Sequence, residues 1–247
     1  MLLKGKNAVV TGCLQGIGKA TLETFAKNGS NVWACALAPN EEFETFCQEL
    51  AEKNNVWIKP IYFDLLDQEQ IKLALKKIAS DKKSIHALVN IAGMTKDAIF
   101  HMIPMDQMKL IFDVNFFSQM YITQYITKLM VRQKFGSVIF ISSISALDGS
   151  YGQLSYSACK AALIGATRTL SKELAEKGIR INALAPGVIA TDMNKVVPES
   201  IISEHIKKMS IKRLGRSEEV SKAILFLASD LSKYVTGQVI RIDGGIK

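Results

Sequence analysis

The sequence predicts an α/β fold, a doubly wound parallel sheet of seven strands flanked by helices, formed as one domain over all 247 residues. Short apolar segments alternate along the chain with longer segments of helical periodicity, which implies right-handed strand-helix-strand crossovers. Several of the short segments are apolar throughout rather than alternating, as expected of strands that are buried on both faces. Ligands of such sheets bind at the carboxyl ends of the strands, so the chemistry is expected there.

The elements follow one another without an internal repeat, a linker or a low-complexity tract. Strands are predicted at residues 7–11, 31–37, 56–63, 87–90, 137–142, 180–185 and 238–242. Helices are predicted at residues 19–27, 41–53, 68–79, 105–132, 156–176, 198–209 and 218–228.

Composition narrows the class of protein. The chain is 48% hydrophobic and 22% charged, which is typical of a globular protein. Its apolar stretches are far shorter than the ~18 residues of a membrane span. The first residues, MLLKGKNAVVTG, run directly into a strand and leave no room for a signal peptide, so we expect a cytoplasmic protein with no membrane partner. Four cysteines without a C-x-x-C motif and three histidines far apart in the sequence predict structural thiols and no metal site.

The formal net charge of +8 suits a phosphorylated cofactor, a substrate that resembles coenzyme A, an acidic carrier protein or nucleic acid. The lysines and arginines are scattered along the chain, and no nucleic-acid-binding motif is present. We therefore expect no nucleic-acid partner.

A glycine-rich turn joins the first strand to the first helix. Gly12, Gly16 and Gly18 stand in VVTGCLQGIGK, directly after the strand. Glycines allow a tight turn and a close approach of the backbone to a pyrophosphate, and the following helix N-terminus offers amide donors. The spacing differs from the G-x-G-x-x-G motif, but the strand before it and the helix after it favour a cofactor site over a plain turn.

The ends of the second and third strands bear on the choice of cofactor. An acidic residue at the end of the second strand would bind a ribose 2′-hydroxyl and repel a 2′-phosphate. Ala36 and Leu37 stand there instead, with neither an acid nor an arginine. This favours NADP(H) and leaves NAD(H) open. Asp64, after the third strand, either caps the next helix or binds an adenine amino group.

Turn-forming residues follow the fourth and sixth strands. They either let a cofactor lie close to the backbone or form plain strand-end turns. Thr191, a little further on, is a candidate for binding the amide or phosphate groups of the cofactor. The turn residues are Asn90, Ala92, Gly93, Pro186 and Gly187.

The segment SYSACK places Tyr156 and Lys160 four positions apart, on one helical face. Such a pair is by itself more often a packing or solvated face than a catalytic site. Ser143, at the end of the fifth strand, would face a substrate carbonyl or serve as an ordinary turn residue. Asn115 lies in an apolar helical segment and needs hydrogen-bond partners, either structural ones or those of a polar relay.

Taken together, these motifs resemble the short-chain dehydrogenase/reductase family. The resemblance runs from TGCLQGIG through NIAG, Asn115, Ser143 and YSACK to PGVIAT and the C-terminal block. Within the family, AGMTKDAIF, GSYGQLSYSACKAALIG and that block are most similar to 3-oxoacyl-(acyl-carrier-protein) reductases. The resemblance implies a Rossmann-type fold and the NADPH-dependent reduction of 3-oxoacyl thioesters of a carrier protein or coenzyme A, in fatty acid biosynthesis.

The resemblance also implies roles for the matching residues. Tyr156 would be the general acid, Lys160 would lower the pKa of Tyr156 and hold the nicotinamide ribose, Ser143 would orient the carbonyl, and Asn115 would anchor a water relay. The implied cofactor-binding residues are Gly12, Gln15, Gly16, Ile17, Gly18, Ala36, Leu37, Asp64, Leu65, Asn90, Ala92, Gly93, Tyr156, Lys160, Pro186, Gly187, Ile189 and Thr191.

Departures from these reductases leave cofactor choice and carrier specificity open; they occur at the CLQ turn, NIAG, Gly136-Ser137, Ser155 and Asp243. Gln15 stands where these reductases usually carry an arginine, and Ser155 stands where an asparagine is common beside the tyrosine. A sugar, a polyol or a small ketone is therefore an alternative substrate, because a fold does not determine a function. A cofactor-binding regulator without catalysis is a further alternative, against which the complete set of four catalytic positions argues.

The family is commonly tetrameric, so the resemblance implies a homotetramer paired through the helices at 105–132 and 156–176. An acidic carrier protein would need basic docking residues. Arg132, Lys134 and Lys172 are candidates, with ordinary solvated positions as the alternative for each.

Overall fold

A parallel seven-stranded sheet forms the centre of the computed structural model, which describes residues 1–191 and 199–246. The strand order is β3-β2-β1-β4-β5-β6-β7, so the chain returns from one edge of the sheet to the middle between β3 and β4. This topology confirms the predicted doubly wound fold and places its switch point between β1 and β4. The strands are β1 (Asn7–Thr11), β2 (Asn31–Ala36), β3 (Ile58–Tyr62), β4 (Ala87–Asn90), β5 (Gly136–Ile141), β6 (Ile179–Pro186) and β7 (Val239–Ile242).

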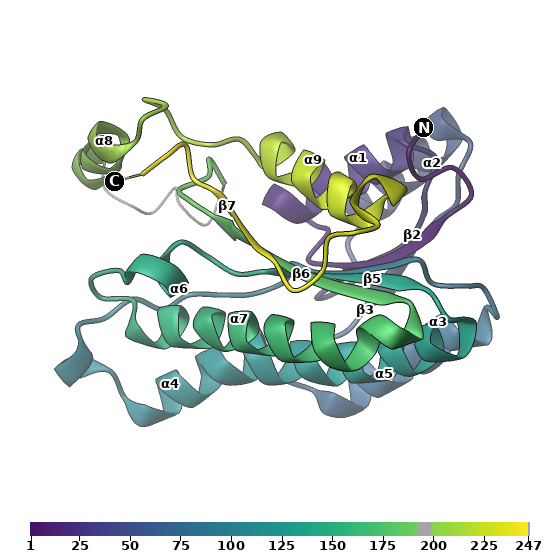
Figure 1. The fold of residues 1–247 in the computed structure, drawn as a ribbon, viewed down its shortest axis with the longest axis horizontal. Helices are drawn as coiled ribbons and strands as arrows, with labels where there is room; N and C mark the ends of the chain where they lie inside the picture. Colours follow the sequence, from purple (N-terminus) through teal and green to yellow (C-terminus); the bar gives the residue numbers. More distant parts are fainter. Residues whose placement is uncertain (192–198, 247) are drawn as a thin grey trace.

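Helices cover both faces of the sheet, with α1, α2 and α9 on one side and α3, α4, α5 and α7 on the other (Figure 1). Asn40 begins α2 by accepting a hydrogen bond from the backbone N–H of Phe43, and Asp67 caps α3 in the same way. The helices are α1 (Gly16–Lys27), α2 (Glu41–Asn54), α3 (Gln68–Ser80), α4 (Met105–Phe112), α5 (Ser118–Gln133), α6 (Ser145–Asp148), α7 (Leu154–Leu174), α8 (Glu199–Lys208) and α9 (Ser217–Ala228).

The strands are buried on both faces, as their continuous apolar sequences predict. Along β1, Val9 packs on the side of α3, α5 and α7, and Val10 packs on the side of α1, α2 and α9. Successive side chains of a strand point to opposite faces, so each strand contributes to two cores. Trp33 and Phe140, which face the same side as Val9, are fully buried.

The helix predicted at residues 105–132 is not regular. It comprises α4, a π-turn (η2, Asp113–Phe117) and α5, and the backbone N–H of Ser118 bonds to the carbonyl of Asp113, five residues back. The sequence also does not predict α6 or the short 3-10 turns η1 (Phe100–Met102), η3 (Ala175–Lys177) and η5 (Asp230–Ser232). Pro198, the first residue of another predicted helix, lies outside the described residues.

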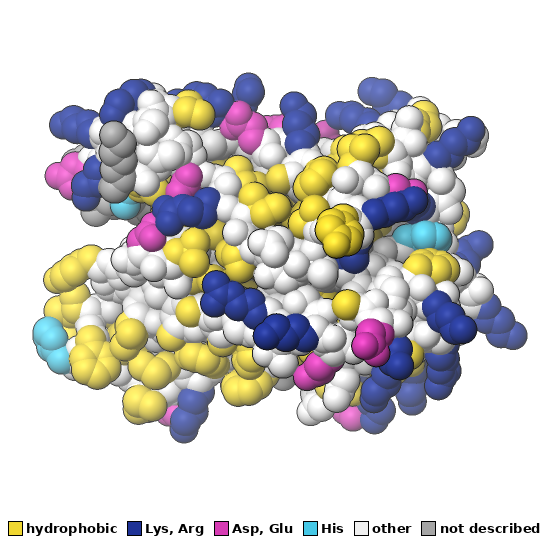
Figure 2. Space-filling model, viewed as in Figure 1, with side chains coloured by type: hydrophobic (Ala, Val, Ile, Leu, Met, Phe, Trp, Pro, Cys, Tyr) yellow, Lys and Arg dark blue, Asp and Glu magenta, His cyan; other side chains and the backbone are white. Residues whose placement is uncertain are grey.

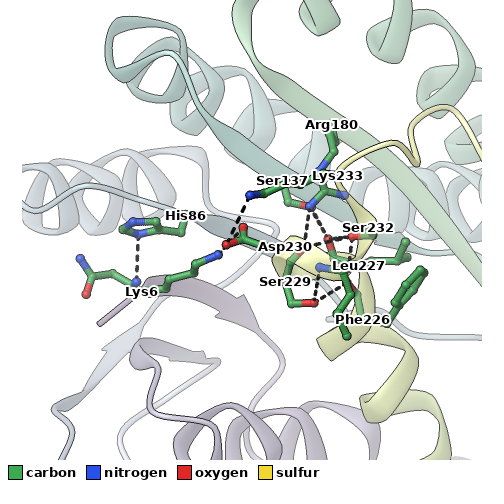
Figure 3. A network of polar contacts seen from close by, with 12 residues as sticks. Lys6, His86, Ser137, Arg180, Phe226, Leu227, Ser229, Asp230, Ser232 and Lys233 are labelled. Carbon is green, nitrogen blue, oxygen red and sulfur yellow. Dashed lines mark hydrogen bonds and ion pairs between the residues drawn. The ribbon is translucent and has the colours of Figure 1, made fainter. Parts of the chain in front are cut away.

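A polar network closes the edge of the sheet where the strands begin (Figure 3). The last carbonyls of a helix lack partners within the helix. Those of α9 accept hydrogen bonds from neighbouring side chains: Arg180 and Ser137 both donate to the carbonyl of Leu227, each at 2.8 Å. Lys6 forms an ion pair with Asp230 at 2.6 Å. The amino ends of the strands therefore serve to anchor α9, and the carboxyl ends are left for a ligand.

On the surface, apolar side chains gather over α4 and the start of α7, with basic residues spread around them (Figure 2). Phe100 is 71% exposed, Met102 66% and Tyr151 92%. The structure contains no helix, within residues 1–191 and 199–246, that is long and apolar enough to span a bilayer. We refer to the exposed side chains of Phe100, Met102 and Tyr151 as the apolar rim.

Candidate active site

A cleft of about 560 Å³ opens at the carboxyl ends of the strands, next to the switch point. The β1–α1 turn, the ends of β2 and β3, the loop after β4, the π-turn and α7 all contribute to its wall. Segments far apart in the sequence therefore meet in one site. The predicted residues on the wall are Gly12, Gln15, Gly16, Ile17, Gly18, Ala36, Leu37, Asp64, Leu65, Ala92, Gly93, Asn115, Tyr156, Lys160 and Thr191.

Four residues predicted to contact the cofactor are not part of this wall: Asn90, Pro186, Gly187 and Ile189. Asn90 is fully buried and donates to Thr123 Oγ1 at 3.0 Å, which ties β4 to α5. Pro186 is buried at the end of β6, and Ile189 belongs to the hydrophobic core. A Cβ at Gly187 would lie 2.9 Å from Asp243, so this glycine permits close backbone packing. The three buried residues, Asn90, Pro186 and Ile189, support the site from within the fold.

The glycine turn has the geometry that a bound pyrophosphate requires. Gly12 and Gly16 have φ angles of +75° and +55°, and a Cβ at Gly18 would overlap the Gly12 carbonyl oxygen. The N-cap residue of α1, Gln15, makes no side-chain capping bond, and the first turn carries no acidic residue. The amide groups of this helix end therefore remain available to an anion, and the turn fits a dinucleotide cofactor.

Asp64 faces the cleft and does not cap α3, which resolves one alternative left open by the sequence. Asp67 is the capping residue, and it accepts hydrogen bonds from the backbone N–H groups of Glu69 and Gln70, both at 3.0 Å. Asp64 accepts a hydrogen bond from the backbone N–H of Leu66 at 2.9 Å. This short turn holds the Asp64 carboxylate at the cleft wall.

Two buried side chains that the sequence motifs do not reveal hold the loop after β4 in place. Thr11 Oγ1 accepts hydrogen bonds from the backbone N–H groups of Ile91 and Ala92, at 2.9 and 3.1 Å. Gln119 Nε2 donates to the carbonyl of Ala92 at 2.9 Å. The spacing of Gln119 from Asn115, one helical turn, is the signal that could have revealed it.

Ser143, Tyr156 and Lys160 come together at this loop. The hydroxyl of Ser143 forms a hydrogen bond with that of Tyr156. One turn further along α7, Lys160 is 2% exposed, and its Nζ lies 5.6 Å from the centre of the Tyr156 ring. The Lys160 ammonium donates to the carbonyl of Ile141, at the end of β5, at 2.8 Å. The helix and the strand end thus bring the predicted hydroxyl, phenol and amine into one cluster, in which Lys160 is buried and Ser143 and Tyr156 are half-buried.

Burial moves the pKa values of Tyr156 and Lys160 in opposite directions, because it disfavours the charged form of each group. Burial, together with the nearby Cys159 and Asp97, raises the pKa of Tyr156 above its ordinary value, against a hydrogen bond from Ser143 that lowers it. Burial lowers the pKa of Lys160 from 10.5 to about 8. Desolvation of the phenol dominates its pKa in this geometry, and the lowering of that pKa by Lys160, which the resemblance implies, stays a prediction.

Asn115 lies in the π-turn and binds the backbone of the loop after β4. Its Oδ1 accepts from the N–H of Met94 at 3.1 Å, and its Nδ2 donates to the carbonyls of Met94 and Ile111, both at 2.9 Å. A Cβ at Gly93 would overlap Asn115 Oδ1 and lie 3.6 Å from Lys160 Nζ. The π-turn therefore brings the Asn115 amide close to the Lys160 amine, in keeping with the frequent placement of such turns at functional sites.

The three candidate docking residues lie away from this cleft on the same chain. Lys172 stands sixteen positions after Tyr156 on α7, a distance of about 24 Å at ~1.5 Å per residue. Arg132 and Lys134 lie at the corresponding end of α5, and all three side chains are exposed. Within one chain, these three charged side chains therefore lie far from Tyr156.

Comparison with known proteins agrees with this architecture. Residues 12–247 match the family described as Enoyl-(Acyl carrier protein) reductase. The chain is 39% identical over 246 residues to the 3-oxoacyl-(acyl-carrier-protein) reductase FabG of Thermotoga maritima, covering 100% of this chain and 99% of the relative. The fold matches the crystal structure of a 3-oxoacyl-(acyl-carrier protein) reductase from Brucella melitensis with a TM-score of 0.92 and 29% identity, over 99% of this chain and 92% of the other.

A further solved structure, from Beutenbergia cavernae, has a TM-score of 0.93 and 28% identity, over 98% of this chain and 96% of the other. It is described as an NAD(P)-dependent gluconate 5-dehydrogenase with bound NADP at low occupancy. The match over nearly the whole chain confirms the resemblance seen in the sequence motifs. The chain belongs to the short-chain dehydrogenase/reductase family of oxidoreductases.

Proposed function

We propose that this protein reduces 3-oxoacyl thioesters, carried by an acyl carrier protein or by coenzyme A, with NADPH, in fatty acid biosynthesis. The observation that carries the proposal is the 39% identity to the Thermotoga maritima reductase across the whole chain. The neutral residues Ala36 and Leu37 at the end of β2 support NADP(H) over NAD(H), because they would not repel a 2′-phosphate.

The cofactor would be held by residues already on the cleft wall. The glycine turn and the amino end of α1 would bind the pyrophosphate, Asp64 the adenine, and Lys160 the nicotinamide ribose. When bound, the cofactor supplies the hydride. The protein supplies position, exclusion of water and protons.

The protonation states of the cluster support reduction at neutral pH. Tyr156 has a pKa above its ordinary value, so its phenol is protonated and can donate that proton to the substrate oxygen. The Ser143 hydroxyl would orient the carbonyl oxygen beside Tyr156. Lys160, with a pKa of about 8, exchanges protons readily near neutral pH and would return one to Tyr156. Asn115 would fix the loop that faces this amine.

The apolar rim beside Tyr156 supports a substrate with an acyl chain. Two loops meet there, joined by a hydrogen bond from the Ala98 N–H to the Gly152 carbonyl at 2.9 Å and by one from Gln153 to Asp97 at 2.8 Å. These loops lead to the exposed side chains of the rim, which include Phe100 and Tyr151. A sugar or polyol would offer these rings little apolar surface.

A second candidate function is the oxidation of a sugar acid or polyol. Its support is the likeness to a structure from Agrobacterium tumefaciens described as a gluconate dehydrogenase, with a TM-score of 0.93 and 26% identity. Fold similarity at this level of identity does not choose between substrates. The apolar rim and the higher identity to the carrier-protein reductase favour the thioester.

We also propose assembly into a homotetramer through α5 and α7. A surface groove of about 930 Å³ runs between α3, α5 and α7, and its wall includes Phe117, which is 58% exposed. A second copy that packed there would cover this ring. Sedimentation of the purified protein tests the assembly, and a monomer at assay concentrations would contradict it.

The function is tested by mixing the purified protein with a 3-oxoacyl thioester and either NADPH or NADH, and following loss of the reduced cofactor. We expect turnover with NADPH, and loss of that turnover in Tyr156→Phe with cofactor binding retained. Turnover of a keto sugar acid but not of the thioester would favour the second candidate. Cofactor binding without turnover of any carbonyl compound would favour a regulator.

A further inference from the structure

Ser145 contacts the Ser143 hydroxyl through both of its donor groups. Its backbone N–H lies 3.2 Å from Ser143 Oγ, and its hydroxyl donates to the same atom at 2.9 Å. The serine hydroxyl has one proton and two acceptor lone pairs. Ser145 therefore occupies both acceptor positions of Ser143 and leaves its single proton to be donated elsewhere.

The remaining partner of Ser143 is Tyr156. Because Ser145 donates to Ser143 Oγ through both its N–H and its hydroxyl, Ser143 is left as a donor toward Tyr156. A hydrogen bond donated by Ser143 lowers the pKa of Tyr156, because it stabilises the phenolate. Because both lone pairs of Ser143 Oγ accept hydrogen bonds from Ser145, the Ser143 proton cannot point at Ser145. The Ser143 hydroxyl is thus held as a donor that points at the phenol.

Ser145 is itself held rigidly. It is 5% exposed and begins α6, whose last residue, Asp148, is bound by Arg241 through two hydrogen bonds of 2.9 and 2.6 Å. The backbone N–H of Ile144 bonds to the carbonyl of Pro186 at 3.0 Å, which fixes the chain between the two serines to the end of β6. The donor groups of Ser145 are therefore positioned before any substrate arrives.

We infer that Ser145 is a positioning residue for the reaction: it fixes the direction of the Ser143 proton so that Ser143 can donate to the substrate oxygen beside Tyr156. This inference deepens the proposed function and rests on the roles given there to Ser143 and Tyr156. Ser145 itself touches neither the phenol nor the cleft wall among the contacts of the described residues. It acts through Ser143.

Ser145→Ala removes the hydroxyl donor and keeps the backbone donor. We expect its kcat for carbonyl reduction to fall about fivefold, the effect of one neutral hydrogen bond, with KM and the dissociation constant for NADPH unchanged. Ser145→Thr keeps the hydroxyl and should restore most of kcat. Ser150→Ala is the matched control, because Ser150 is an exposed serine two residues after the end of α6. Thermal midpoints of all variants show whether each is folded.

The pH profile gives a readout that a purely structural role would not move. In the oxidative direction the phenol must lose its proton, so the rate rises with pH through the pKa of Tyr156. Weaker donation from Ser143 should shift the profile of Ser145→Ala to higher pH. The kcat of each variant is divided by that of the wild type on whichever carbonyl compound the wild type reduces. If the wild type does not reduce thioesters, this result overturns the proposed function and leaves the inference about Ser145 testable on another carbonyl compound.

Three results would overturn the inference about Ser145: full kcat in Ser145→Ala, an equal loss in Ser145→Thr, or a loss confined to KM. A fall in kcat that followed a fall in the thermal midpoint, with an unshifted pH profile, would assign Ser145 to stability and would also overturn it.

Discussion

Replacing Lys160 by methionine should stabilise the protein while abolishing its activity. Lys160 is 2% exposed, and its ammonium donates to the carbonyl of Ile141 at 2.8 Å. Burial lowers its pKa from 10.5 to about 8, so the folded protein carries the protonated amine at a free-energy penalty at neutral pH. Methionine has an unbranched apolar side chain that fills a similar space without a charge.

The size and sign of the effect follow from the two pKa values. The difference between 10.5 and about 8 corresponds to about 3 kcal/mol at about 1.4 kcal/mol per unit. Because the folded pKa is the lower one, the penalty is fully present below about pH 8 and vanishes as pH rises toward 10.5. Losing the hydrogen bond from the charged amine to Ile141 costs about 2 kcal/mol. Lys160→Met should therefore be more stable than wild type by about 1 kcal/mol at pH 7.

Urea unfolding at a series of pH values between neutrality and the ordinary lysine pKa measures this difference directly. The advantage of Lys160→Met should shrink as the pH rises and reverse sign once the amine is neutral in both states, leaving only the lost hydrogen bond. Lys172→Met, at an exposed position on the same helix, is the control and should show no such trend. If Lys160→Met is less stable than wild type at pH 7, the desolvation argument is wrong.

Further predictions concern the site and the opposite edge of the sheet. In Gly93→Ala the new Cβ would overlap Asn115 Oδ1, so kcat should fall at least tenfold in a folded protein. The control is Gly165→Ala, where a Cβ meets nothing within 4 Å. Equal kcat values in the two variants would contradict the reasoning. The kcat for reduction should fall as pH rises through about 8, where Lys160 loses its proton, and a flat profile across that range would exclude its return of protons to Tyr156. Arg180→Met should lower the free energy of unfolding by about 2 kcal/mol, because Arg180 binds the last carbonyls of α9. Its activity measured at 25 °C should be unchanged. A loss of activity would show that the amino ends of the strands are coupled to the cleft at their carboxyl ends.

The fold and most of the cleft wall could be predicted because local rules determine them. A strand buried on both faces has a continuous apolar sequence, and the turn after β1 closes only with glycines. Both features can therefore be recognised in the sequence. Residues at the carboxyl ends of neighbouring parallel strands must meet, so the order of strands and helices along the chain is enough to place Gly12, Ala36 and Asp64 in one site.

The remaining features depend on contacts between distant segments. The π-turn around Asn115 forms where its amide binds the backbone of Met94, and no helical periodicity reports that contact. Asn90 has the sequence position of a cofactor residue, but its side chain points back to Thr123 inside the fold. Several residues adjoin each strand end, and only packing decides which of them face the ligand.

Burial also decides the protonation state from which each direction of the reaction begins. The sequence identifies Tyr156 and Lys160 by chemical type, but their pKa values depend on desolvation, which pushes both groups toward their neutral forms. At neutral pH a reduction begins from the majority state of Tyr156, the protonated phenol. An oxidation would have to begin from the rare phenolate. An enzyme leaves the equilibrium of its reaction unchanged. Burial of this phenol, however, keeps Tyr156 protonated in nearly every enzyme molecule at neutral pH, and the proposed reduction of 3-oxoacyl thioesters begins from that state.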